Sequence, residues 1–166
     1  MSPWANRPFN QKYKGLPLSV IELHIRPYKE SDEDSVIKLW LACGLTVPWN
    51  DPQKDINRKL SVQRELFIVG LLNDQVIATA MGGYDGHRGW VNYLGVDPKF
   101  QRMGYARQIM QDLQNQLLDM GCPKINLQIR ESNEAAIEFY KQIGFKQDAV
   151  LSMGHRLIPD KSKSGN

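Results

Sequence analysis

The stretch GVDPKFQRMGYA, from Gly95 to Ala106, separates two different patterns of apolar residues. The apolar run that precedes it, at 90–96, is typical of a strand. After it, apolar residues recur at helical spacing until Gly121: Ala106, Ile109, Met110, Leu113, Leu117 and Met120. Residues 125–129 then alternate between apolar and polar, as in a second strand. This order predicts a right-handed crossover between two parallel strands.

The N-terminal half of the chain carries weaker but readable patterns. Residues 21–25 alternate at strand spacing, and Pro27 closes the run. An amphipathic helix is predicted from residues at helical spacing before Gly44: Val36, Leu39, Trp40 and Cys43. Asp51 followed by Pro52 predicts the start of a short second helix, because Asp caps well and Pro is tolerated at the first helical position.

The remaining elements are mostly strands. Apolar runs at 66–72 and 76–81 predict a hairpin, and the glycine-rich 82–89 predicts a turn. A fourth helix is expected at 136–143, and two terminal strands within 145–158. The sequence thus predicts an α/β (α+β) fold with about four helices and a mixed, mostly antiparallel sheet of six to seven strands around a central parallel β-α-β pair.

Composition narrows the class of protein. The 166 residues are 42% hydrophobic, enough for one core, so we expect a flexible N-terminal extension at 1–19, a single domain at 20–160 and a tail at 161–166. The net charge of +3 is too small and too interspersed to indicate nucleic-acid binding. No apolar run approaches membrane length and no signal peptide is visible, so a cytoplasmic protein is expected. The three histidines and two cysteines lack metal-ligand spacing, so no metal is predicted.

Two interpretations of the loop from Gln101 to Ala106 remain open. Gly104 permits backbone angles that larger residues avoid, and the amides at the start of the following helix point outward without partners. Such amides, together with the helix dipole, suit a pyrophosphate. The same residues also fit an ordinary helix start in which the glycine serves packing.

A resemblance favours the first interpretation. LGVDPKFQRMGYARQIM resembles the acyl-CoA-binding segment of the GNAT superfamily of N-acetyltransferases, whose pattern is a strand, a loop Q/R-x-x-G-x-G/A and a helix. LQIRESNEAAIEFYKQIGFKQ resembles its second signature, and PWNDP and MGGYDGHRG are similar to bacterial YpeA-type members. Ala106 stands where many members carry Gly. The resemblance implies a GNAT-like sheet whose central parallel strands splay apart.

The resemblance also implies roles for individual residues. Coenzyme A would be bound by the strand end and loop, and by an asparagine that also suits a helix N-cap: Leu94, Gly95, Val96, Gln101, Arg102, Met103, Gly104, Tyr105, Ala106 and Asn133. Tyr140 would protonate the departing thiolate, although a packing role on an apolar helix face is the competing interpretation. Acetyl-CoA would then transfer its acetyl group by direct amine attack, with a backbone N–H near Leu94 or Gly95 stabilising the oxyanion.

The acceptor side is less defined. Glu65, Asp85 and His87 are candidates for the base that deprotonates the amine, each equally suited to a solvated turn. Trp49, Tyr84 and Asp85 would form the acceptor pocket for a small-molecule or peptide amine, and Trp49 also fits a plug between two helices. A non-catalytic acyl-CoA sensor is the alternative function, and a nucleotide-binding domain would leave residues 133–145 unexplained. The sequence leaves a monomer and a homodimer both open.

Overall fold

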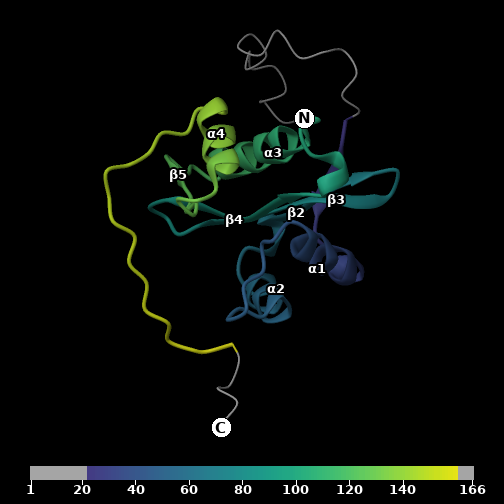
Figure 1. Cartoon of the computed structure of the whole chain (residues 1–166), viewed down its shortest axis with the longest axis horizontal. Helices are drawn as coiled ribbons and strands as arrows, with labels where there is room; N and C mark the ends of the chain where they lie inside the picture. The colour runs from purple at the N-terminus through teal and green to yellow at the C-terminus, as the bar shows by residue number, and fades with distance from the viewer. Residues whose placement is uncertain (1–21, 161–166) are drawn as a thin grey trace.

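The computed structural model describes residues 22–160, so the predicted extension at 1–19 and tail at 161–166 lie outside the described part. Its helices and strands follow the predicted order as far as α4 (Figure 1). They are β1 (His24–Pro27), α1 (Glu33–Ala42), α2 (Pro52–Leu60), β2 (Phe67–Leu72), β3 (Gln75–Tyr84), β4 (Gly89–Val96), α3 (Tyr105–Asp119), β5 (Ile125–Asn126) and α4 (Glu134–Gln142). Single 3-10 turns span Glu30–Asp32, Arg64–Leu66 and Pro98–Phe100.

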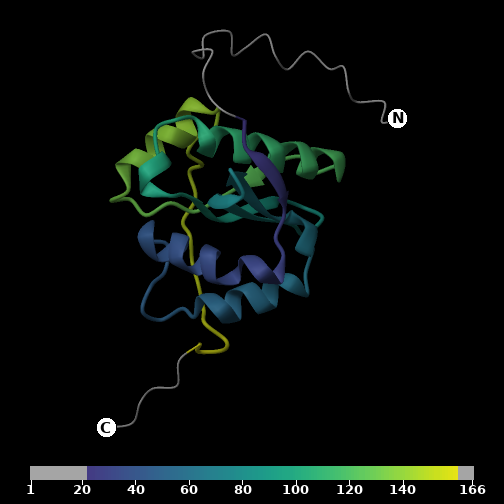
Figure 2. The same cartoon turned by 90° about the vertical axis from the view of Figure 1, so that its right-hand side faces the viewer.

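One mixed sheet organises these elements. Its order is β1-β2-β3-β4-β5; every neighbouring pair is antiparallel except β4 and β5, which are parallel. Helices α1 and α2 cover one face and α3 and α4 the other, as the two views show (Figures 1 and 2). The predicted α/β class, the antiparallel majority and the parallel pair are confirmed; among the described residues this pair lies at the edge of the sheet, not at its centre.

Burial on both faces explains the continuous apolar run of β2. Phe67 and Val69 belong to the core cluster that includes Trp40 of α1. Ile68, which points to the opposite face, belongs to the cluster that includes Ile109 of α3. The short turn to β3 places Asn73 and Asp74 at φ values of 49° and 61°. Left-handed angles at both positions suit a two-residue hairpin.

The predicted turn at 82–89 is wrong in its extent. Residues 82–84 belong to β3, and β4 already begins at Gly89, which leaves residues 85–88 for the turn. A Cβ on Gly82 would lie 2.6 Å from Cδ1 of Leu113. This glycine therefore allows α3 to approach the sheet closely, a role that its clustering with turn glycines hid.

The predicted count of six to seven strands is also wrong. Among the described residues the sheet has five strands, and the predicted strand at 125–129 is reduced to Ile125–Asn126. Residues 145–158 hold no strand. Five of the apolar side chains that motivated that prediction are 70% to 93% exposed: Val150, Leu151, Met153, Leu157 and Ile158. Without a sheet partner, the alternation that suggests a strand has nothing to pair with.

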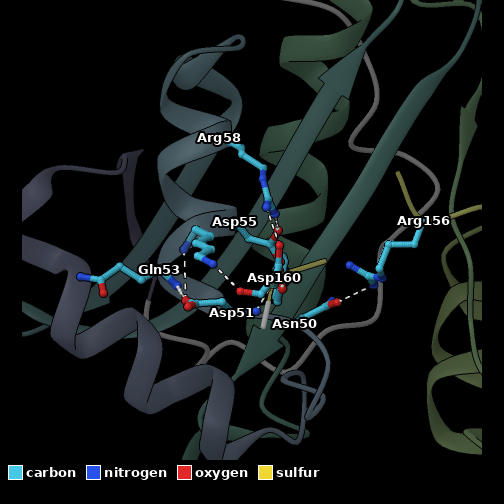
Figure 3. A network of polar contacts seen from close by, with 9 residues as sticks. Asn50, Asp51, Gln53, Asp55, Arg58, Arg156 and Asp160 are labelled. Carbon is cyan, nitrogen blue, oxygen red and sulfur yellow. Dashed lines mark hydrogen bonds and ion pairs between the residues drawn. The ribbon is translucent and has the colours of Figure 1, made fainter. Parts of the chain in front are cut away.

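The C-terminal segment (residues 145–160) runs from α4 to the opposite side of the molecule (Figure 1), where it is anchored on α2 (Figure 3). The Asp160 side chain, only 1% exposed, accepts hydrogen bonds from the Asp51 amide (3.0 Å) and from Arg58. Lys54 donates to the Asp160 carbonyl. Arg156 donates to Asn50 Oδ1 at 2.9 Å, which adds a second contact (Figure 3).

We expect Asp160→Asn to lower the melting temperature at pH 7. The Arg58 guanidinium and the Asp51 amide hold the pKa of Asp160 at about 2, below its ordinary value of 3.8. A depressed folded-state pKa stabilises the fold above pH 3.8, and that contribution disappears as the pH falls toward 2. The difference in melting temperature between wild type and variant should therefore become smaller as the pH falls through this range. Thermal unfolding followed by circular dichroism measures it.

Asp148→Asn is the matched control for this experiment. Asp148 lies in the same segment, and its ion pair with Lys124 is exposed on both sides. Exposed pairs contribute little, so its removal should leave the melting temperature nearly unchanged. Equal effects of the two substitutions would contradict the anchoring role of Asp160.

Candidate active site

The loop predicted to hold a pyrophosphate connects β4 to α3 through two left-handed residues. Arg102 and Gly104 have φ values of 62° and 87°. Gln101 Nε2 donates to the Val96 carbonyl at 2.9 Å, which ties the loop to the end of β4. Met103 is exposed, whereas Tyr105 is buried against the core. The loop is therefore fixed at both ends and turns its middle outward.

The first turn of α3 differs from those of α2 and α4. Asp51 accepts from the Gln53 and Lys54 amides, and Asn133 Oδ1 accepts from the Ala136 amide at 3.1 Å. Gly104 occupies the same position before α3 and provides no side-chain cap. The first amides of a helix have no intrahelical acceptors, so this end suits an anionic group from outside. The N-cap role predicted for Asn133 is present; its contact with coenzyme A stays a prediction.

Strands β4 and β5 part almost as soon as they meet. They pair only at Gly89 with Ile125 and at Trp90 with Asn126. The rest of β4, including Leu94 to Val96, has no β5 partner on that side. Backbone groups of an unpaired strand edge can bond an extended ligand as if it were an added strand. The splayed parallel pair that the resemblance implies is thus present.

A bulge interrupts β4 on its other side. Thr79 pairs with Gly95 and Met81 with Asn92, so Tyr93 and Leu94 together lie opposite Ala80. Tyr93 has a φ of 50°. A bulge leaves one residue out of the ladder and disrupts the local hydrogen bonding. It falls at the position where the oxyanion-stabilising amide is predicted, near Leu94 or Gly95.

Tyr140 belongs to the core cluster that includes Val91 and Val96 of β4. Its ring makes edge contacts with Phe139 and Phe145, at centroid distances of 5.1 and 5.3 Å. Burial raises the pKa of Tyr140 above its ordinary value of 10.0, so the phenol keeps its proton at neutral pH. Both interpretations of Tyr140 fit this geometry: it packs as an aromatic, and it is a neutral proton donor.

Two of the three candidate bases, Asp85 and His87, lie in the turn before β4 and away from the bulge. Asp85 Oδ1 accepts from the Arg88 and His87 amides at 2.7 and 2.8 Å, and these bonds lower the pKa of Asp85. This turn precedes Gly89, which is five residues and thus about 16 Å along the strand from Leu94. Glu65 lies in the 3-10 turn before β2.

The predicted acceptor pocket is divided between the two ends of α2. Trp49 is exposed in the loop before α2, near the end where Tyr93 Oη donates to Asp55 at 2.5 Å. Tyr84 lies at the other end, where Gln63 Nε2 donates to its carbonyl at 2.8 Å. The Tyr84 hydroxyl donates to the Gly86 carbonyl at 3.2 Å. Trp49 and the pair Tyr84 and Asp85 therefore do not share one pocket.

Sequence reasoning missed the residues that surround the bulge. Nothing in the sequence around Tyr93 indicates its left-handed backbone conformation, because aromatic residues are common in strands. Thr79 and Asp55 contact Tyr93 from 14 and 38 residues away. Such contacts have no local signal. Two further findings concern the described residues only: no helix is long and apolar enough to cross a membrane, and no three His, Cys, Asp or Glu side chains gather as a metal site.

Comparison with known proteins identifies relatives over most of the chain. The sequence profile of the Acetyltransferase (GNAT) family matches residues 21–145. A curated relative, "Acetyltransferase YE1169" of Yersinia enterocolitica, is 42% identical over 139 residues, which cover 84% of this chain and 99% of the relative.

Solved structures share the fold at lower identity. The ribosomal-protein-S18-alanine N-acetyltransferase of Escherichia coli is 23% identical, with a TM-score of 0.65 over 76% of this chain and 79% of that one. Naa20 of Chaetomium thermophilum, in complex with a bisubstrate analogue, is 20% identical, with a TM-score of 0.63 over 72% and 69%. The profile match and the 42% relative establish that this chain belongs to the GNAT family of acetyltransferases.

Proposed function

We propose that the protein transfers an acetyl group from acetyl-CoA to a primary amine by direct attack within a ternary complex. One observation carries this proposal: the outward amides at the start of α3, the unpaired edge of β4 and its bulge follow one another along one path. A pyrophosphate, an extended pantetheine arm and a thioester carbonyl occur in the same order in acetyl-CoA. Family membership supports the same cosubstrate.

The proposed roles follow from this path. Amides of residues 101–106 bind the pyrophosphate, and the β4 edge at 94–96 bonds the pantetheine amides, with Asn133 contacting the same arm. The thioester carbonyl meets an amide at the bulge, near Leu94 or Gly95. Tyr140, neutral because it is buried, gives its proton to the leaving thiolate.

The amine approaches from the α1 and α2 side of the sheet. Helices α3 and α4, with the pyrophosphate loop, occupy the other side (Figure 2). An alkylamine resembling lysine is protonated below about pH 10.4, so a base must remove its proton. Glu65, Asp85 and His87 remain our candidates, and Asp85 and His87 would act through water because of their distance along β4. The proposed acceptor contacts form two separate groups: Trp49 at one end of α2, and Tyr84 with Asp85 at the other.

Thermal shift and turnover together test this function. Acetyl-CoA should raise the melting temperature while ATP with Mg²⁺ does not, since binding at 100 times the dissociation constant stabilises by about 2.7 kcal/mol. Thiol release should then appear with at least one member of a panel of amines, polyamines, amino acids and peptides with free N-termini. Binding without release across the panel would favour the non-catalytic acyl-CoA sensor instead.

Gly104→Val should abolish acetyl-CoA binding, measured by isothermal titration calorimetry. A branched side chain disfavours the left-handed backbone of Gly104 and would therefore change how the loop presents the first amides of α3. Gly121→Val is the matched control, because Gly121 has a φ of 82° at the other end of α3. Both variants should lose stability by about 1–3 kcal/mol. Undiminished binding by the Gly104 variant would remove the loop from the site.

Tyr140→Phe should lower the rate of thiol release by about 10²-fold, in the range typical of a lost general acid, while acetyl-CoA affinity stays within about threefold. The aromatic packing persists in Phe, so the fold is preserved. Phe139→Leu serves as a control for packing, since it alters the neighbouring ring without removing a hydroxyl. A normal rate for Tyr140→Phe would leave the tyrosine with packing alone.

A further inference from the structure

The backbone of Tyr93 is strained, and neighbouring residues must hold it in this conformation. Its φ of 50° lies in the left-handed region, which aromatic residues rarely adopt. It occurs inside β4, at the bulge opposite Ala80. Strained backbone persists only where neighbouring groups over-determine it, and it clusters at functional sites.

Three contacts from three other elements hold Tyr93 in place. The Thr79 hydroxyl of β3 donates to the Tyr93 carbonyl at 2.9 Å. The indole of Trp40 on α1 stacks on the Tyr93 ring, with centroids 3.9 Å apart and planes 15° from parallel. The Tyr93 hydroxyl donates to Asp55 Oδ2 on α2 at 2.5 Å. Backbone and side chain of one residue are thus fixed independently.

The direction of the Thr79 hydrogen bond is itself fixed. Trp40 Nε1 can only donate, and it donates to Thr79 Oγ1 at 2.9 Å. The Thr79 proton is therefore directed to its other partner, the Tyr93 carbonyl. Thr79 is fully buried, so water does not compete for either bond. The hydroxyl supplies a donor to a carbonyl at the point where the β3–β4 ladder shifts register.

We propose that Thr79 and Tyr93 are positioning residues that set the β4 bulge, so that its amide meets the carbonyl oxygen of the acetyl thioester. The inference rests on the proposed function, which places that carbonyl at the bulge. Neither residue touches the reacting atoms. Thr79 acts through its hydrogen bond to the Tyr93 carbonyl. Tyr93 acts through its backbone conformation, which sets the orientation of the following residue, Leu94.

The test compares two ligands that differ in the carbonyl alone. S-ethyl-CoA keeps the nucleotide and pantetheine but has a methylene where acetyl-CoA has its thioester carbonyl. One well-placed hydrogen bond should make the wild type prefer acetyl-CoA by about tenfold in dissociation constant, measured by calorimetry. Because no acceptor amine is present, the measurement does not depend on identifying one.

Thr79→Val should reduce this preference to within about twofold of unity, since the valine cannot donate to Tyr93. Affinity for S-ethyl-CoA should stay within about threefold of wild type, because the remaining contacts persist. Thr79→Ser restores the hydroxyl and should restore the preference, which a general loss of packing would not explain. Tyr93→Phe, which keeps the ring but loses Asp55, should lower the preference to about threefold and provides a milder variant should Thr79→Val fold poorly.

Tyr28→Phe is the matched control. Tyr28 is buried in the core cluster that also contains Trp40, and its ring stacks on Phe67. Its hydroxyl has no hydrogen-bond partner among the described residues. Its removal should leave the preference unchanged. A preference for acetyl-CoA that survives Thr79→Val and Tyr93→Phe overturns the positioning role, as does a wild type that binds both ligands equally. If the wild type binds neither ligand, the proposed function itself fails and the inference falls with it.

Discussion

The brief parallel contact between β4 and β5 is the constraint on which the rest of the structure depends. The two strands share only two residue pairs before they separate. A longer ladder would satisfy the backbone of residues 94–96 internally and leave no edge for an extended ligand. The crossover helix α3 follows β4 after a short connection, and Gly104 at its start provides no side-chain cap. The early separation of two parallel strands thus creates the candidate site.

Local chemistry explains which parts of the fold could be predicted from the sequence. The repeating apolar face of α3, the Asp51–Pro52 start of α2 and the hairpin of β2 and β3 each depend on neighbouring residues, and each is confirmed. The C-terminal segment could not be predicted in this way. Its apolar residues alternate as in a strand. Its position, however, is fixed by the contact between Asp160 and Arg58 of α2, and Arg58 lies more than a hundred residues earlier in the chain.

The same distinction between local and long-range contacts applies to the candidate site. The conformation of the loop around Gly104 could be predicted, because glycine is the residue that most readily adopts the left-handed backbone found there, whereas its binding of a pyrophosphate stays a prediction. The bulge is not readable, because Tyr93 resembles any strand tyrosine and its partners Thr79, Trp40 and Asp55 come from three other elements. The acceptor contacts were grouped by residue type alone. The structure separates Trp49 from Tyr84 because α2 lies between them.

The stacking of Trp40 on Tyr93 has a practical consequence. Trp40 is fully buried and its indole N–H is bonded, whereas Trp49 and Trp90 are exposed to water. Its emission therefore differs in wavelength and in quenching from that of the solvated indoles. A fluorophore native to the chain touches the strained residue of the bulge. The proposed binding of acetyl-CoA at β4 can accordingly be tested optically, without a label, in the unmodified protein.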